Sequence, residues 1–283
     1  MDGARLLAER EFHDRQAAER ARTFEAQPEL LEVTDEAYLD HETWIRPALA
    51  QLGPLQDMRV LDFGCGHAMA SVVMARQGAR VTGFDLSRGY LTEARQRAKH
   101  NGVRVGFLQA DGNRLPFANG SFDCIWGNAV LHHLDLAQAS AEIARVLAPD
   151  GCAVFCEPWG ENWLLRLARG LAASPLNDRT ADEEPLRQRD LAIFRRSFAE
   201  IGVQGYQLLS MAARIVRRQG KIPGLETCDR LLLNCIPPLR RYCRYVVLTL
   251  RRPRLVKFED AAHSRPRRHG SAQPESVARL REA

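Results

Sequence analysis

The sequence lacks any long apolar run. The longest ones, such as RLLLNCIPPL and YVVLTL, fall far short of the roughly 20 apolar residues that a membrane-spanning helix requires. The first sixteen residues, MDGARLLAEREFHDRQ, are charged throughout and contain no apolar core of a secretory signal peptide. These two absences argue against a secreted or membrane-spanning protein, and we expect a cytoplasmic one.

Cysteine pairs with a known chemical purpose are also missing. The chain of 283 residues has seven cysteines, none of them in a CxxC pair, and Cys152 and Cys156 lie within an apolar run. No group of His, Cys and Asp residues has the spacing of metal ligands. We therefore expect reduced, mostly buried thiols and no metal ion.

Acidic residues are scarce near the carboxyl end, so the net charge of +5 is unevenly distributed. Between Gly205 and Ala283 there are seventeen Lys or Arg residues and only six Asp or Glu residues. One interpretation is a solvated surface followed by a disordered tail. The alternative is a surface for an anionic partner, such as a membrane that contains acidic lipids.

The order of apolar segments predicts the fold. Helical patterns at 4–22 and 35–52 come first, and short apolar strands then alternate with helices, which predicts a doubly wound, parallel α/β sheet. Ser87 is expected to be the N-cap of one of these helices. The expected strands are 58–63, 80–86, 103–111, 122–128, 152–158, 203–210 and 244–252. The expected helices between and after them are 68–79, 87–102, 136–151, 189–202 and 224–239.

The stretch RVLDFGCGHA is the most informative one, because a strand there ends in an acid and a turn with two glycines, Gly64 and Gly66. Small residues at the carboxyl end of a parallel strand let the backbone approach a ligand. Nicotinamide dinucleotides and S-adenosylmethionine are both bound by such turns. Met69 stands where the dinucleotide pattern GxGxxG requires its third glycine. Asp62 would be awkward beside a pyrophosphate but suits the ammonium of a methionine moiety, so the turn favours S-adenosylmethionine.

VLDFGCGHA resembles motif I of class I S-adenosylmethionine-dependent methyltransferases, and four later segments resemble the family's other motifs in the right order. These segments are VTGFDLS, QADGNRLPF, FDCIWGNAVLHHL and VLAPDGCAVFCEP. The branch that contains quinone-biosynthesis and natural-product small-molecule methyltransferases is the most similar one. Ala68 departs from the pattern, because the family commonly has a third glycine there. The resemblance implies a Rossmann-like, seven-stranded sheet that is mostly parallel, with an antiparallel last strand.

The resemblance also implies how the cofactor, S-adenosylmethionine, is held. It places Asp85 at the ribose hydroxyls, Asp111 at the adenine amino group and Asn128 near the methionine end. Structural roles stay open as alternatives: Asp62 and Asp111 could be capping acids, and Asp85 an exposed residue at a strand end. The full set of expected cofactor-binding residues is Asp62, Gly64, Cys65, Gly66, Asp85, Leu86, Asp111, Gly112 and Asn128.

We expect the chain to divide into three regions. Residues 1–54 are expected to form an N-terminal helical lid, and residues 55–252 the methyltransferase domain, with an insertion at about 159–190. Residues 253–283, rich in Arg, Pro, His and Ser, are expected to be a disordered basic tail. The lid and the insertion would form the roof of the acceptor pocket, with His13, Glu157, Trp159 and Asn162 as its substrate-binding residues.

The expected reaction is methyl transfer to oxygen or carbon of a small-molecule or lipid-linked acceptor. GNAV stands where amino-methylating enzymes carry an [N/D]PP[Y/F] loop, and the sheet region has no basic, aromatic-rich pattern typical of nucleic-acid binding. A hydroxyl acceptor usually needs a general base; His133 is the first candidate and His132 the second. For at least one of the two, an ordinary loop histidine is the alternative.

Two other functions stay open at this point: a catalytically silent S-adenosylmethionine-binding protein, and a nicotinamide-dependent oxidoreductase. The basic region near the carboxyl end also has two interpretations. Arginines flank LLLNCIPPL, either as part of a packed surface helix or as a contact with the anionic inner face of a membrane. They include Arg230, Arg240, Arg241 and Arg244.

Overall fold

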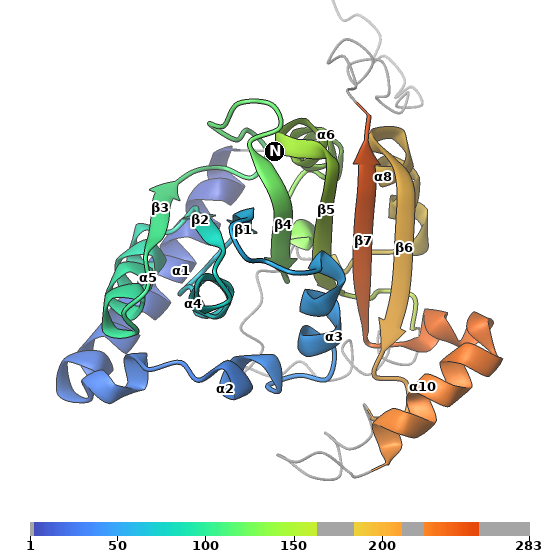
Figure 1. Ribbon diagram of the computed structural model, residues 1–283, viewed down its shortest axis with the longest axis horizontal. Coiled ribbons are helices and arrows are strands. Elements are labelled where there is room, and N and C mark those ends of the chain that lie inside the picture. Colours follow the sequence, from blue (N-terminus) through green and yellow to red (C-terminus); the bar gives the residue numbers. More distant parts are fainter. Residues whose placement is uncertain (1–2, 163–183, 211–223, 255–283) are drawn as a thin grey trace, which may run out of the picture.

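A seven-stranded sheet runs through the protein in the order β3-β2-β1-β4-β5-β7-β6 (Figure 1). The computed structural model describes residues 3–162, 184–210 and 224–254. All strand pairs are parallel except those of β7, which is antiparallel to both β5 and β6. This arrangement confirms the expected fold class. The strands are β1 (Arg59–Phe63), β2 (Arg80–Asp85), β3 (Val105–Gln109), β4 (Phe122–Asn128), β5 (Leu147–Pro158), β6 (Phe198–Tyr206) and β7 (Tyr245–Pro253).

Helices cover both faces of this sheet. The α-helices are α1 (Gly3–Ala26), α2 (Asp35–Leu39), α3 (Ile45–Leu49), α4 (Met69–Arg76), α5 (Arg88–His100), α6 (Leu136–Val146), α8 (Leu191–Ser197) and α10 (Leu225–Cys235). Short 3-10 segments are η1 (Pro28–Leu31), η2 (Ala50–Leu52), η3 (Leu131–His133), η4 (Gln188–Asp190) and η5 (Pro237–Tyr242). Ser87 caps α5 as expected, because its side chain accepts a hydrogen bond from the Tyr90 N–H.

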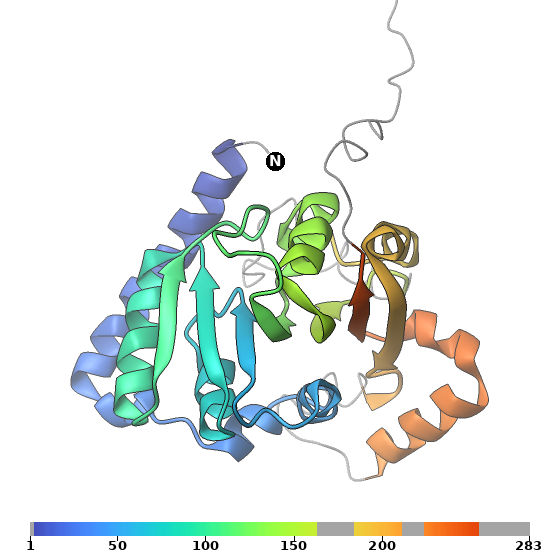
Figure 2. The same cartoon turned by 45° about the horizontal axis from the view of Figure 1, so that its top comes forward.

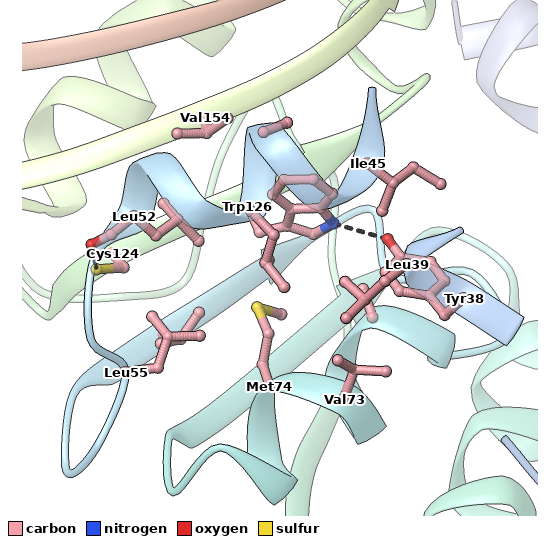
Figure 3. Close-up of a cluster of buried hydrophobic side chains, with 14 of the residues drawn as sticks. Tyr38, Leu39, Ile45, Leu52, Leu55, Val73, Met74, Cys124, Trp126 and Val154 are labelled. Atoms are coloured by element: carbon pink, nitrogen blue, oxygen red, sulfur yellow. Dashed lines mark hydrogen bonds between the residues drawn. The ribbon is translucent and has the colours of Figure 1, made fainter. Parts of the chain in front are cut away.

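Successive residues of the central strands enter two different cores, as the pleat of a β-strand requires. In β4, Trp126 packs against α3 and α4 on one face (Figure 3), whereas Ile125 packs in the cluster on the other face. The indole N–H of Trp126 donates to the hydroxyl of Tyr38 on α2 at 3.2 Å. The N-terminal helices therefore contribute directly to the core on that face.

Several expected element boundaries were wrong. The strand expected at 203–210 is β6 at Phe198–Tyr206, and the helix expected at 224–239 ends at Cys235. The helix expected at 35–52 is two short helices and a 3-10 segment. The helix expected at 136–151 ends at Val146, and the one expected at 189–202 ends at Ser197. In the last two cases a strand begins instead, because pairing with β4 or β7 supplies backbone hydrogen bonds that local sequence does not reveal.

The N-terminal helix α1 lies along α5 (Figure 2). Arg20 of α1 donates to Glu93 of α5 at 3.0 Å, and this pair is partly buried. The expected lid boundary at residue 54 and the domain boundary at 252 stay predictions. Most of the expected insertion and tail lie outside the described residues. Over the part of the chain that is described, no helix is both long and apolar enough to span a bilayer.

Candidate active site

The turn expected from its two glycines follows β1 directly. Gly64 and Gly66 have φ angles of +67° and +48°, in the left-handed region that favours glycine. A Cβ at Gly64 would lie 2.5 Å from a methyl group of Val130, so a larger residue does not fit there. Ala68 also has a positive φ, +65°, which explains why a third glycine suits this position.

A cavity of about 200 Å³ opens beside this turn, at the carboxyl ends of β1, β2 and β4. Its walls bring together nine of the residues expected at the site. These are His13, Gly64, Gly66, Asp85, Leu86, Asp111, Gly112, Asn128 and His133. The residue pattern did not identify Phe63, Phe84, Tyr90, Ala110, Ala129, Val130 and Leu134, which make up most of the apolar wall. Of these residues, Tyr90 could have been found from the sequence, because it lies in the first turn of the helix that follows β2.

Asp85 lies at the end of β2 with both carboxylate oxygens engaged by backbone groups. Oδ2 accepts from the Gly66 N–H and Oδ1 from the Ser87 N–H, each at 2.9 Å. Burial raises the pKa of Asp85 above its usual value, and the two backbone hydrogen bonds partly offset this effect. The carboxylate therefore ties the glycine turn to the start of α5 and forms part of the cavity wall.

Asp111 is both a turn residue and a wall residue. Its Oδ1 accepts from the backbone N–H and the side-chain amide of Asn113, at 2.9 and 2.7 Å. This is the capping role that the sequence left open as an alternative. Because Asp111 also lines the cavity, the two roles are compatible.

Asp62 and Cys65 stand behind the turn and are not among the residues of the cavity wall. Asp62 is buried, and the hydroxyl of Ser71 on α4 donates to it at 2.5 Å. Burial raises the pKa of Asp62 to about 7, against the effect of the Ser71 hydrogen bond. Cys65 is also buried, and its N–H donates to the Phe84 carbonyl at 2.8 Å, which joins the turn to β2.

Helix α1 closes one side of the cavity. His13 lines it, and its Nδ1 lies 3.2 Å from the hydroxyl of Tyr90. That hydroxyl donates to Gln16 at 2.7 Å, and the guanidinium of Arg20 lies over the Tyr90 ring. The N-terminal segment is thus part of the site in this structure.

The two histidines after β4 occupy different places. His133 lines the cavity, whereas His132 lies behind it, with ring centroids 4.1 Å apart. Nδ1 of His132 lies 2.8 Å from the carboxylate of Glu157, which is completely buried at the end of β5. The same carboxylate accepts the backbone N–H groups of Val130 and Leu131, each at 2.9 Å.

Trp159 and Asn162 make structural contacts in this structure. Trp159 is buried in the core cluster and pairs with Leu186. Asn162 is buried too, and its amide donates to the Tyr242 carbonyl at 2.6 Å. The expectation that they contact an acceptor stays a prediction.

A second cavity, of about 460 Å³, lies between α3, β6 and α10. It is larger than the first but shares none of its lining residues. The cavity at the glycine turn is the better candidate for the cofactor site, because the carboxylates of Asp85 and Asp111 and the backbone of the glycine turn all line it. No cluster of His, Cys, Asp and Glu able to hold a metal ion occurs among the described residues.

The groups that line the smaller cavity fit S-adenosylmethionine. Asp85 and Asp111 offer carboxylates for hydroxyl and amino groups, and Phe84, Val130 and Leu134 offer apolar surface for a flat ring. The turn leaves no room for a side chain at Gly64, so only backbone atoms of this residue line the cavity. A dinucleotide's third glycine is absent, since Met69 begins α4.

Comparison with known proteins gives an independent result. Residues 61–155 match the family model described as "Methyltransferase domain". The chain is 31% identical over 147 residues to the demethylmenaquinone methyltransferase of Beutenbergia cavernae, which covers 47% of this chain and 60% of that protein. It is 30% identical over 203 residues to the phthiotriol/phenolphthiotriol dimycocerosates methyltransferase 1 of Mycobacterium ulcerans, covering 71% of this chain and 69% of that protein.

Solved structures agree on the fold. The PH0226 protein of Pyrococcus horikoshii OT3 superposes with a TM-score of 0.54 at 18% identity, covering 82% of this chain and 99% of that one. This chain spans between 35% and 69% of the length of the curated relatives that it matches. The sheet order, the glycine turn and these similarities lead to one conclusion: the chain belongs to the family of class I S-adenosylmethionine-dependent methyltransferases.

Proposed function

We propose that this protein transfers a methyl group from S-adenosylmethionine to oxygen or carbon of a small-molecule or lipid-linked acceptor. The observation that carries the proposal is the convergence of the glycine turn, Asp85 and Asp111 on one cavity at the carboxyl ends of β1, β2 and β4. Bound there, S-adenosylmethionine would supply a methyl group on a positively charged sulfur, which is a good leaving group.

The chain's own residues would hold the two ends of this cofactor. Asp85 suits the ribose hydroxyls, because a carboxylate whose geometry is already fixed by two backbone N–H groups needs no rearrangement. Asp111 suits the adenine amino group. Asp62, whose pKa burial raises to about 7, would be ionised more readily with an ammonium group nearby.

Positioning is then the main catalytic task of the protein. Holding the acceptor in line with the methyl group at near-contact distance is worth several kcal/mol of the barrier. Helix α1 contributes by placing His13 at the cavity, against Tyr90 of α5, which would reduce the access of water. Asn128 at the end of β4 and His133 in η3 line the same cavity and would face the methionine end.

The names of the relatives support the acceptor class. One relative is named for a quinone, demethylmenaquinone, and another for lipids, the phthiotriol and phenolphthiotriol dimycocerosates. We infer an apolar acceptor of this general kind. A nucleic-acid acceptor has no support in the site, whose polar side chains are His13, His133, Asn128, Tyr90 and two carboxylates rather than a basic surface.

Contact with an anionic membrane would give such an acceptor a route to the site. Leu231 of α10 is 58% exposed, and Ile236, just beyond the helix, is 47% exposed. Arg230, Arg240 and Arg241 are also exposed in this region. Apolar side chains bordered by cations are typical of surfaces that seat on acidic lipids.

The proposal is tested with the purified full-length protein. Calorimetry should show binding of S-adenosylhomocysteine and no binding of NAD. Labelled S-adenosylmethionine, incubated with quinone and lipid extracts, should yield a labelled product that mass spectrometry can identify. NAD binding alone would favour an oxidoreductase, and cofactor binding without any labelled product would favour a silent binding protein.

A further inference from the structure

We propose that the larger cavity, between α3, β6 and α10, is a second ligand site that takes one anionic amphiphile, a single apolar chain with a negatively charged head group. This inference goes beyond methyl transfer and does not depend on it. The cavity has a volume of about 460 Å³, and we call it the α10 cavity. Figure 1 shows α3 and α10 on either side of the end of β6.

The α10 cavity is separate from the cofactor cavity at the glycine turn. The cofactor cavity lies at β1, β2 and β4, whereas the strands that line the α10 cavity are β6 and β7. Strand β5 stands between these two groups in the sheet. Small-molecule sites in proteins typically have volumes of about 300–1,000 Å³, so the α10 cavity is large enough for a ligand of its own.

Apolar surface from three elements lines the cavity. Pro47 comes from α3, Tyr206 from the end of β6 and Leu233 from α10. Gly202, in the middle of β6, adds backbone with no side chain above it. An apolar chain that leaves water for such a surface is stabilised in proportion to the area it buries.

Gly202 keeps the floor of the cavity open. Its φ is not in the left-handed region, and a Cβ there would lie 3.5 Å from that of Thr249, which is an ordinary contact. At Gly205, by contrast, a Cβ would lie 2.6 Å from the Sγ of Cys243, so glycine is required there. A glycine inside a strand weakens the strand, because no side chain packs at that position. Neither the backbone nor its neighbours require this cost at Gly202.

Two arginines line the cavity without an acidic partner. Arg230 of α10 and Arg240 of η5 are both exposed, and neither forms an ion pair with any residue that the structure describes. A guanidinium group binds a carboxylate or a phosphate through two parallel hydrogen bonds. These two side chains are therefore suited to hold an anionic head group at the opening of the cavity.

Two acids also line the cavity, and one of them is already fully engaged. Asp229 is buried, and its carboxylate accepts the backbone N–H groups of residues 208–210 and the hydroxyl of Ser210. Glu226 is exposed in the first turn of α10, where the helix dipole favours a carboxylate. Two arginines then stand against one exposed acid, so the charge that remains favours an anion.

The α10 cavity would give this helix a specific contact with a lipid. Leu231 and Ile236 expose apolar side chains on the same segment. One chain from a lipid surface would enter the cavity, while its head group stayed with Arg230 and Arg240. Because the ligand would touch both α10 and β6, it would also tie the helix to the sheet.

The test uses the purified full-length protein and dodecanoate, below the concentration at which it forms micelles. Calorimetry should show saturable binding of one molecule per chain, with affinity that rises about fourfold for each methylene added between octanoate and dodecanoate. Prior addition of S-adenosylhomocysteine should leave this binding unchanged. Absence of saturable binding, or competition with S-adenosylhomocysteine, would overturn the proposal. Binding of S-adenosylhomocysteine itself is a separate result, which tests the proposed function.

The location of the ligand is tested with Gly202→Phe, whose new side chain would fill the cavity. Gly106→Phe is the matched control, because Gly106 lies in the opposite edge strand, β3, and a Cβ there would be 3.8 Å from its nearest neighbour, on Thr82. Gly202→Phe should reduce dodecanoate affinity by a factor of about ten or more, since several methylenes lose their contacts. The control should bind as wild type does. Equal affinity in both variants would place the ligand elsewhere and overturn the proposal.

The head group is tested by replacing both Arg230 and Arg240 with Gln, which are surface changes that keep the test available if Gly202→Phe does not fold. The double variant should bind dodecanoate about five- to tenfold more weakly and bind 1-dodecanol as wild type does. An equal loss for both compounds would overturn the anionic head group. Tighter binding of dodecyl phosphate than of dodecanoate would support a phospholipid-like ligand, and the reverse order would support a fatty acid.

Discussion

The hydroxyl of Ser87, the residue before α5, donates a hydrogen bond of 2.6 Å to Asp14 on the N-terminal helix. The same oxygen of Asp14 accepts the Gly89 N–H at 2.9 Å. A Cβ at Gly89 would lie 2.8 Å from that of Ala17, so α1 and the start of α5 are in close contact. Because Ser87 directly follows the Asp85–Leu86 pair at the cavity, this contact ties the N-terminal helix to the candidate site.

Replacing Asp14 with Ala should therefore loosen α1 and weaken cofactor binding together. The lost charged hydrogen bonds predict a decrease in S-adenosylhomocysteine affinity of about 1–2 kcal/mol, together with faster tryptic cleavage within α1. Calorimetry and limited proteolysis measure the two effects. Glu19→Ala, an exposed site on the same helix, is the matched control. Equal cleavage rates in both variants would show that Asp14 does not anchor the helix.

Asp85→Ala should weaken cofactor binding by about 1–3 kcal/mol, the scale of hydrogen bonds to a charged group. Both the proposed contact with the ribose and the hydrogen bond from the Gly66 N–H would be lost. Isothermal titration of a variant with native circular dichroism is the measurement. Asp123→Ala removes an acid that pairs with Arg59, outside the cavity wall, and should bind normally. Unchanged affinity in Asp85→Ala would remove Asp85 from the site.

Because burial raises the pKa of Asp62, we expect the free energy of unfolding to decrease as pH rises toward 7. Its pKa in the folded protein is about 7, well above the value of an unfolded Asp, so the folded state binds the extra proton between these two values. The stability that this proton contributes is complete below the unfolded pKa and is lost as pH rises toward 7. Asp62→Asn keeps an oxygen for Ser71 but does not titrate.

Urea unfolding of the wild type and of Asp62→Asn between pH 4 and pH 8 tests this expectation. The two proteins should be similar near pH 4, and the variant should become the more stable one, by a few kcal/mol, as pH approaches 7. Asp123→Asn is the control: because Arg59 lowers the pKa of Asp123, this group titrates below the tested range, and the difference in stability from the wild type should stay nearly constant between pH 4 and pH 8. Parallel pH curves for the wild type and Asp62→Asn would mean that Asp62 is not a titrating buried acid.

The proposed membrane contact predicts binding to liposomes that strengthens with acidic lipid and weakens with salt. Replacing Arg230 and Arg241 by Gln should reduce the free energy of binding by about 2 kcal/mol, since each cation near the surface contributes about 1 kcal/mol. Arg80 and Arg104, exposed beside β2 and β3, form the control pair. Absence of co-sedimentation at low salt would leave an acceptor that reaches the site from solution.

Local sequence was sufficient to predict the features that depend on neighbouring residues. The alternation of apolar strands and helices predicted β1 to β5, and residue type alone identified Ser87 as a helix cap. The same reasoning placed Gly64 and Gly66 at the turn after the first strand, and the structure adds that both have a positive φ, which glycine adopts without strain. Asp85 and Asp111 reached the cavity as predicted, since both follow the carboxyl ends of parallel strands.

Tertiary contacts determined the rest. The sequence alone established the motif order, the parallel sheet and the glycine turn, because these depend on residues within a few positions of one another. Three contacts at and near the site are visible only in the folded structure. They are Asp62–Ser71, His13–Tyr90 and Glu157–His132. Each of these contacts joins residues from different elements, 9, 77 and 25 positions apart, and no local pattern specifies which side chains meet when those elements pack.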